Sequence, residues 1–170
     1  DIGSNDGTLL SFYPDDGPEL IGIDPTSRKY ARFYKPHIRR VESLFPSDAL
    51  TSVLAGRRAK VVTSIAMAYD VEEPQSFFND VAAVLADDGI WLLEQSYMPT
   101  MVEITAYDTI CHEHLEYYGL TQIDYLARRA GLRVLDVALN DINGGSFVAT
   151  VCKADAPHVG DPEAVSACLE

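Results

Sequence analysis

The sequence predicts an α/β fold in which a mostly parallel sheet ends in an antiparallel hairpin. Apolar strand patterns alternate with helix patterns along the 170 residues, which favours parallel strands joined by crossover helices. Near the C-terminus, two strand patterns are separated by a turn too short to hold such a helix.

Short apolar runs rich in β-branched residues define the strands. The clearest are E-L-I-G-I-D, K-V-V-T-S-I-A and I-W-L-L-E-Q, and Asp87, Asp88 and Gly89 are expected to form the turn into the last of these. The predicted strands cover residues 19–24, 38–42, 60–66 and 90–95, and residues 1–3 resemble the end of a further strand.

Capping and turn residues set the helix boundaries. Thr26 is expected to cap one helix, and Pro74 suits the first turn of another. Thr121 and Asp124 fit a T-x-x-D capping box for a helix that stops at Gly131. The predicted helices cover residues 6–13, 26–34, 47–55, 74–85 and 121–130.

The last two predicted strands form an antiparallel hairpin, which distinguishes this sheet from a fully parallel one. Residues 132–139 and 146–152 flank the turn N-D-I-N-G-G, in which Asn143 and Gly144 are a strong hairpin signal. A parallel sheet closed by such a hairpin is typical of the Rossmann-like class I methyltransferase sheet, whereas dehydrogenase sheets usually stay parallel there. The role of this segment as a hairpin turn explains its residues without any further function. Contact between the turn and a substrate is the less favoured interpretation.

Charge and composition restrict the partners. Thirteen basic residues against 26 acidic ones argue against a nucleic-acid surface, which needs clustered Lys and Arg. No apolar run approaches the roughly 18 residues of a membrane span. The three cysteines are far apart in the sequence, which argues against a disulfide framework and against an all-cysteine zinc site. We therefore expect a cytoplasmic protein with a small-molecule substrate and neither nucleic acid nor membrane as partner.

An acidic glycine loop, D-I-G-S-N-D-G, opens the chain. Glycine lets the backbone turn sharply and approach a ligand closely between a strand and a helix. Asn5 stands where dinucleotide enzymes place the glycine that admits a pyrophosphate. Asp1 and Asp6 suit the ammonium and sulfonium groups of S-adenosylmethionine better than a diphosphate. The loop therefore favours this cofactor over NAD, with a glycine turn that binds no ligand as the alternative.

Asp24 ends the second strand about 20 residues after Gly3, where an acid typically accepts hydrogen bonds from ribose hydroxyls. The alternative role is an ordinary turn acid beside Pro25. The candidates for binding S-adenosylmethionine come from the loop, this acid and the end of the strand at 60–66, and comprise Asp1, Gly3, Ser4, Asn5, Gly7, Asp24, Pro25, Ser64 and Ala66.

A long irregular stretch, 96–120, contains the segment Y-D-T-I-C-H-E-H-L-E-Y-Y, which is dense in groups that move protons. A histidine titrates near neutral pH, and a neighbouring carboxylate can orient it. The first interpretation is a general base with an orienting partner, and the second is a structural loop. A metal site on His112 and His114 ranks third, because no distant His or Cys pair completes it.

Taken together, these motifs resemble the central domain of the sugar C-methyltransferases, which act on nucleotide-linked keto-deoxysugars. The segments that carry the resemblance are D-I-G-S-N-D-G-T-L-L, G-I-D-P, E-Q-S-Y-M-P, Y-D-T-I-C-H-E-H-L-E-Y-Y and N-D-I-N-G-G-S-F. In this family a zinc-binding domain precedes the core and another domain follows. The resemblance implies that residues 1–153 are a methyltransferase core with a truncated first strand, and that 154–170 begin a linker or a following domain.

The resemblance also implies a mechanism, in which a base removes the proton beside the sugar ketone and the enolate carbon attacks the sulfonium methyl. By position, His114 is the base with Glu113 beside it, and His112 and Tyr107 complete the catalytic candidates. The family often has Tyr at the position of Cys111 and His near Tyr69. An NAD(P)-dependent oxidoreductase and a non-catalytic fragment are the alternative functions.

Overall fold

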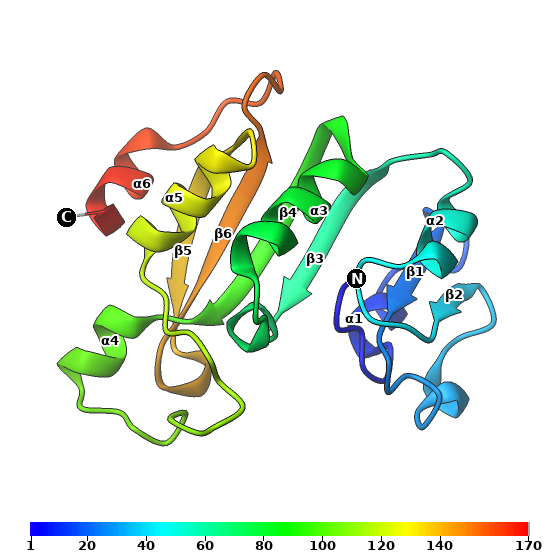
Figure 1. The fold of residues 1–170 in the computed structure, drawn as a ribbon, viewed down its shortest axis with the longest axis horizontal. Helices are drawn as coiled ribbons and strands as arrows, with labels where there is room; N and C mark the ends of the chain where they lie inside the picture. The colour runs from blue at the N-terminus through cyan, green and yellow to red at the C-terminus, as the bar shows by residue number, and fades with distance from the viewer. Residues whose placement is uncertain (170) are drawn as a thin grey trace. The chain divides into compact units, whose positions relative to one another are not determined.

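Residues 1–169 are described by a computed structural model, in which the chain divides into two units (Figure 1). Unit 1 comprises Asp1–Arg58, drawn in blue and cyan, and unit 2 starts at Ala59 and runs from green to red. In the part of the chain that the structure describes, no helix combines the length and apolar character needed to cross a bilayer.

Unit 1 is built on two parallel strands, β1 (Leu20–Ile23) and β2 (Ile38–Val41). Ile2 adds a parallel bridge to Ile23, so the start of the chain lies beside β1. Leu10, Leu20 and Ile38 form the apolar centre, against which Tyr13 and Tyr34 pack. The helical segments are α1 (Thr8–Ser11), η1 (Ala31–Phe33) and α2 (Asp48–Leu54).

Unit 2 is a four-stranded sheet with the order β3-β4-β6-β5. The strands are β3 (Ala59–Ile65), β4 (Leu85–Ser96), β5 (Leu132–Asn140) and β6 (Ser146–Lys153). β3 and β4 are parallel, whereas β6 pairs antiparallel with both β4 and β5. The predicted hairpin is therefore confirmed, with η3 (Ile142–Gly144) at its tip and Asn143 and Gly144 both in the left-handed region.

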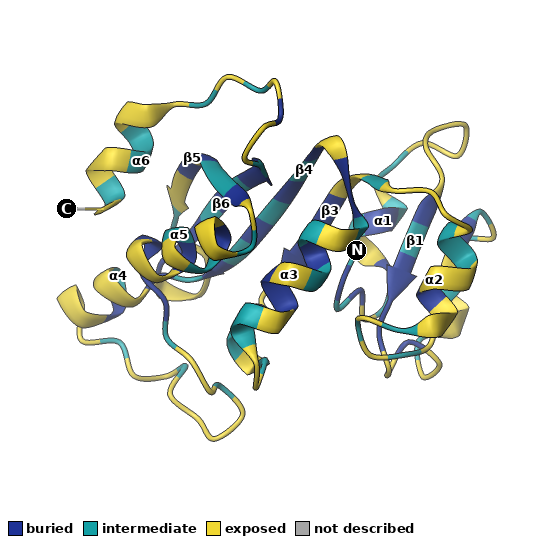
Figure 2. Cartoon of the chain, turned by 45° about the horizontal axis from the view of Figure 1, so that its top comes forward, coloured by how far each residue is buried: buried dark blue, intermediate teal, exposed yellow. Residues whose placement is uncertain are grey.

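The core of unit 2 centres on Trp91 of β4, which is fully buried. Phe78 of α3 (Pro74–Val84) packs edge-on against its indole, with ring centroids 4.8 Å apart. The Trp91 indole N–H donates to the hydroxyl of Ser64 on β3 at 2.9 Å. Figure 2 shows buried stretches in dark blue on α3 and along β4. The remaining helical segments are η2 (Ala68–Asp70), α4 (Met98–Glu103), α5 (Leu120–Arg129) and α6 (Pro162–Leu169).

The helix expected from Thr26 to about Tyr34 does not form. The Thr26 hydroxyl and amide both donate to one oxygen of the Asp24 carboxylate, at 2.7 and 2.6 Å. Asp24 thus holds Thr26 in a turn directly after β1, and side chains that bind nearby backbone groups in this way compete with helix formation. A series of turns and the short η1 follow instead.

Two further boundaries differ from the expectation. Helix α5 begins at Leu120, one residue earlier than predicted, with Gly119 as its N-cap. The Gln122 side chain accepts a hydrogen bond from the Gly119 amide at 3.0 Å, which stabilises this start. Thr121 therefore lies inside the helix, and Asp124 pairs with Arg128. The D-D-G segment is not a separate turn, because β4 starts at Leu85 and accommodates it as an irregularity in its pairing with β3.

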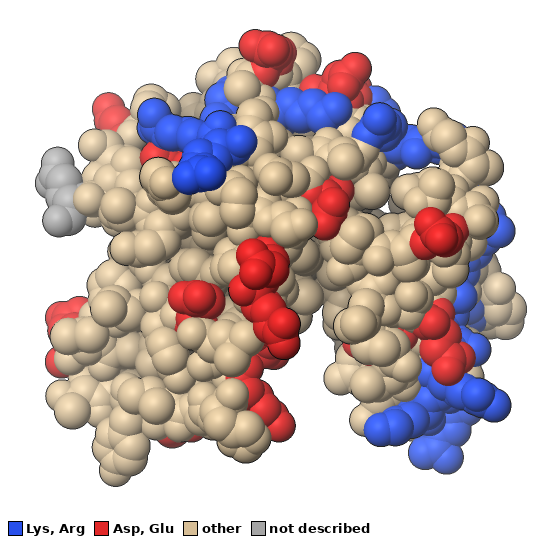
Figure 3. Space-filling view, viewed as in Figure 1, with Lys and Arg blue, Asp and Glu red and all other residues tan. Residues whose placement is uncertain are grey.

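Charge is distributed unequally between the two parts of the chain. Residues 1–58 contain eight basic and eight acidic side chains, whereas residues 59–170 contain five basic and 18 acidic ones. The whole formal net charge of −13 therefore belongs to the second part. Figure 3 shows its acidic side chains in red on the face that Figure 1 presents.

We expect Ser64→Ala to lower the free energy of unfolding by about 1–3 kcal/mol, because the buried Trp91 N–H loses its acceptor. Urea unfolding followed by the fluorescence of Trp91, the single tryptophan, measures this loss. The control is Ser76→Ala on the exposed side of α3, which should stay within about 0.5 kcal/mol of the wild type. Equal losses in the two variants would contradict a structural role for the Ser64 hydroxyl.

Candidate active site

The glycine loop of unit 1 turns through three residues in the left-handed region. Gly3, Asn5 and Gly7 have φ values of 73°, 46° and 77°. The loop is fastened to β1 at its start, since the Gly3 amide donates to the Ile23 carbonyl at 2.9 Å. The sharp turn expected from the glycine spacing is therefore present.

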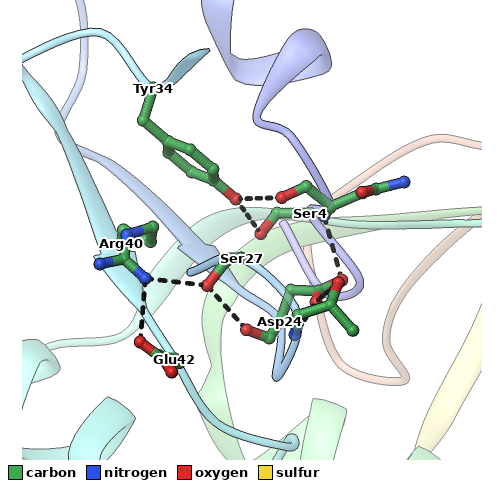
Figure 4. Close-up of polar contacts among 8 residues, drawn as sticks. Ser4, Asp24, Ser27, Tyr34, Arg40 and Glu42 are labelled. Atoms are coloured by element: carbon green, nitrogen blue, oxygen red, sulfur yellow. Dashed lines mark hydrogen bonds and ion pairs between the residues drawn. The ribbon is translucent and has the colours of Figure 1, made fainter. Parts of the chain in front are cut away.

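Asp24 joins this loop to the turn that follows β1 (Figure 4). Its carboxylate is 9% exposed and accepts from the Asn5 amide at 3.0 Å, in addition to its two bonds from Thr26. A carboxylate offers about four acceptor positions, so about one remains for a ligand hydroxyl. This arrangement fits a ribose hydroxyl, and it adds a structural task for Asp24. Pro25 is exposed beside it.

Tyr34 is a residue of this site that sequence reasoning missed. The Ser4 hydroxyl lies 2.8 Å from the Tyr34 hydroxyl, which donates to the Asn5 carbonyl at 3.0 Å (Figure 4). A Cβ atom at Gly7 would lie 3.0 Å from the Tyr34 ring and would push against it, and the φ of 77° at this position also favours glycine. Burial raises the pKa of Tyr34, which keeps its hydroxyl protonated as a donor. No motif marks this tyrosine, because its role depends on chain segments 30 residues apart.

The loop carries negative charge at neutral pH. The Thr8 hydrogen bonds to the Asp6 carboxylate hold the pKa of Asp6 below its usual value. An anionic loop suits a cationic ligand and repels a diphosphate. The backbone turns, the remaining acceptor position of Asp24 and this charge together fit S-adenosylmethionine.

The two remaining cofactor candidates lie in unit 2, at the end of β3. The Ser64 hydroxyl is fully buried and bonded to Trp91, so its side chain belongs to the core. Ala66 is exposed and has a left-handed φ of 52°, and its amide donates to the Glu94 carbonyl at 2.8 Å. Contact of either residue with the cofactor stays a prediction.

The H-E-H segment, residues 107–118, is anchored to η2, the short helical segment after β3. The Tyr69 carbonyl accepts hydrogen bonds from the Leu115 and Glu116 amides at 2.9 and 3.0 Å. The rings of Tyr69 and His114 are in contact, with centroids 4.3 Å apart. Among the catalytic candidates, His114 is therefore partly buried against Tyr69, whereas Tyr107, His112 and Glu113 are exposed.

Asp70 supplies a second carboxylate near His114, and it too was missed. Burial raises the pKa of Asp70, the charge of His114 lowers it, and the charge of Glu113 raises it. The Asp70 carboxylate is therefore close enough to interact electrostatically with both the His114 imidazole and the Glu113 carboxylate. Asp70 is the last residue of η2, directly after Tyr69, and the sequence offered no pattern to connect it with a histidine more than 40 residues away.

A cavity of about 10 Å³ lies next to His114. Its walls come from three segments of unit 2 and include Tyr69, Gln95, Ser96, Thr109, His114 and Tyr118. Within residues 1–169, no group of three or more His, Cys, Asp or Glu side chains is arranged to hold a metal ion.

A family model described as "Methyltransferase domain" matches residues 1–137. The chain belongs to this family, and its cofactor is S-adenosylmethionine. The expected Rossmann-like class I methyltransferase fold is thereby confirmed, and the nicotinamide-dependent alternative is set aside.

Among characterised proteins, the C-methyltransferase NovU of Streptomyces niveus is 29% identical over 171 residues. The alignment covers 93% of this chain and 38% of NovU, so the chain spans about two fifths of that relative's length.

Two solved structures share the fold. LepI in complex with S-adenosylmethionine has a TM-score of 0.70 at 15% identity, covering 89% of this chain and 42% of LepI. The 1,6-didemethyltoxoflavin-N1-methyltransferase of Burkholderia thailandensis, solved with 1,6-didemethyltoxoflavin and S-adenosylhomocysteine, has a TM-score of 0.65 at 15% identity, covering 89% of this chain and 68% of that one.

Tyr34→Phe should weaken S-adenosylmethionine binding about 2- to 12-fold, because the glycine loop loses hydrogen bonds worth about 0.5–1.5 kcal/mol. Isothermal titration of the full-length protein measures the change. Tyr13→Phe is the matched control, since Tyr13 packs on the same apolar cluster and is expected to leave the affinity unchanged. An unchanged dissociation constant in Tyr34→Phe would show that its hydroxyl does not hold the loop for the cofactor.

Proposed function

We propose that this chain is the catalytic core of an S-adenosylmethionine-dependent C-methyltransferase, which methylates the carbon beside a ketone in a nucleotide-linked keto-deoxysugar. The observation that supports this proposal most directly is the contact between His114 and Tyr69 after β3. It puts a group able to accept a proton at an edge of the sheet where ligands bind in this class of fold.

That edge is formed by the carboxyl ends of two parallel strands. Ile65 of β3 pairs with Glu94 of β4, so both strands end at the same level. Tyr69 follows the first strand, and Gln95 and Ser96 end the second. In open α/β sheets, ligands bind outside the carboxyl ends of the strands, which favours an acceptor site beside His114.

His114 is the general base of the proposed reaction. It takes the proton from the carbon beside the ketone, and the negative charge of Asp70, which interacts with His114, stabilises the imidazolium that results. Bound S-adenosylmethionine supplies a methyl group on a sulfonium, which is already an activated leaving group. The Tyr69 ring and the two backbone bonds to its carbonyl hold the histidine in position.

The sugar acceptor is supported by the name of NovU as a C-methyltransferase and by the resemblance of the H-E-H and N-G-G-S segments. The charge of unit 2 restricts how such an acceptor binds. Each of its five basic side chains already has a partner, in the pairs Lys60–Asp88, Arg128–Asp124, Lys153–Asp87, Arg129–Tyr125 and Arg133 with the Ala154 carbonyl. We therefore assign the keto-sugar ring to unit 2 and the diphosphate to cations outside it.

In the full-length protein, His114→Ala should reduce methyl transfer about 10²- to 10⁴-fold, which is the usual contribution of a positioned general base. The dissociation constant of S-adenosylmethionine should change little, because the cofactor loop lies in a different unit. Methyl transfer is measured with a nucleotide-linked keto-deoxysugar and radiolabelled cofactor.

His158→Ala is the control, since His158 bonds to the carbonyl of Asp88 near the start of β4, whereas the proposed acceptor site lies at the other end of that strand. It should keep full activity. If His114→Ala also transfers methyl groups at the wild-type rate, His114 is not the base.

A further inference from the structure

Two polar side chains of unit 2 are buried without a hydrogen-bond partner, and both line the cavity beside His114. Gln95 is 2% exposed, and both its amide oxygen and its amide nitrogen lack a partner. Tyr118 is 6% exposed, and its hydroxyl also lacks one. Burying such groups unpaired is unfavourable, so three unpaired atoms around one cavity point to a ligand.

Backbone hydrogen bonds hold both residues in place beside the cavity. Gln95 shares one face of β4 with the fully buried Trp91 and Leu93, because side chains alternate along a strand. Its backbone pairs with Phe147 of β6, which fixes its position. Tyr118 is held through its carbonyl, which accepts from the Met98 amide at 2.9 Å.

The size of the cavity limits what it can bind. At about 10 Å³ it has room for one water-sized group, which corresponds to a single oxygen atom of a ligand and excludes a sugar ring. The Gln95 amide nitrogen and the Tyr118 hydroxyl line this space without a partner, and both can donate a hydrogen bond to a ligand oxygen. A carbonyl oxygen meets both conditions.

We propose that Gln95 and Tyr118 form an oxyanion site, in which the Gln95 amide and the Tyr118 hydroxyl donate hydrogen bonds to the ketone oxygen of the methyl acceptor. This inference rests on the proposed C-methyl transfer.

The chemistry of the reaction gives these donors a role. When the C–H bond breaks, the proton goes to His114 and the electron pair moves through the new C=C bond to place a negative charge on the ketone oxygen. The carbon then bonds to the methyl group, the C–S bond breaks with its electrons left on sulfur, and the C=O bond is restored. Donors already aimed at that oxygen stabilise the charge as it develops. Burial, together with the charge of Glu116, raises the pKa of Tyr118 to about 12, so its hydroxyl is protonated and able to donate at neutral pH.

The test uses the full-length protein and two variants, Tyr118→Phe and Gln95→Met. Exchange of the acceptor proton with D₂O is followed by NMR, with a nucleotide-linked keto-deoxysugar as acceptor and with S-adenosylhomocysteine in the cofactor site. We expect each variant to slow exchange and methyl transfer about 10²- to 10³-fold, with the cofactor dissociation constant unchanged. Each should also raise Tm by a few degrees, because an unpaired buried polar group has been removed.

Tyr125→Phe on the exposed side of α5 is the control and should match the wild type in both rates. If Tyr118→Phe and Gln95→Met exchange and methylate within about threefold of the wild type, the oxyanion site is wrong and the cavity is a site for structural water only. If the wild type itself neither exchanges the proton of this acceptor nor methylates it, both the proposed function and the oxyanion site are wrong. The rise in Tm without ligand separates these results, since it depends only on the unpaired groups.

Discussion

The position of β6 between β4 and β5 is the constraint on which unit 2 depends. β6 is hydrogen-bonded antiparallel to both neighbours, and Phe147, Ala149 and Val151 along one of its faces have no exposed surface. A slip of one residue would exchange this buried face for the other one, so the register is strongly determined. The same register pairs Gln95 with Phe147 and thereby fixes where β4 ends. The hydrogen bonding of a C-terminal strand thus sets the geometry of the candidate acceptor site.

The candidate catalytic groups lie on loops at this edge of the sheet, and few hydrogen bonds hold these loops. The Tyr69 carbonyl accepts hydrogen bonds from two backbone amides of the H-E-H segment. The Tyr118 carbonyl accepts one from the backbone amide at the start of α4. Placing reactive groups on loops supported by a fixed sheet is the usual division of labour in enzymes. In unit 1 the same principle applies to the glycine loop, where Asp24 and the Tyr34 hydroxyl hold the turn through its backbone atoms.

Sequence patterns predicted the strands and the hairpin well, because alternation and turn residues act over a few positions. They failed at Thr26, where a helix cap and a turn look alike and the bond to Asp24 decides between them. They also passed over Tyr34 and Gln95. The role of Tyr34 depends on a contact with Gly7, and the importance of Gln95 depends on burial without a partner. Both properties arise only once distant segments have come together.

The confinement of the net charge to residues 59–170 has a kinetic consequence. Summed over a surface, like charges create a long-range field that speeds the approach of oppositely charged ligands and slows that of anions. Encounter with a cationic sulfonium compound is therefore fastest at low ionic strength, whereas encounter with an anionic nucleotide is slowest there. At physiological ionic strength the field extends only about 8 Å, which brings the two encounter rates closer together. Salt therefore changes the relative encounter rates of cationic and anionic ligands with this part of the chain.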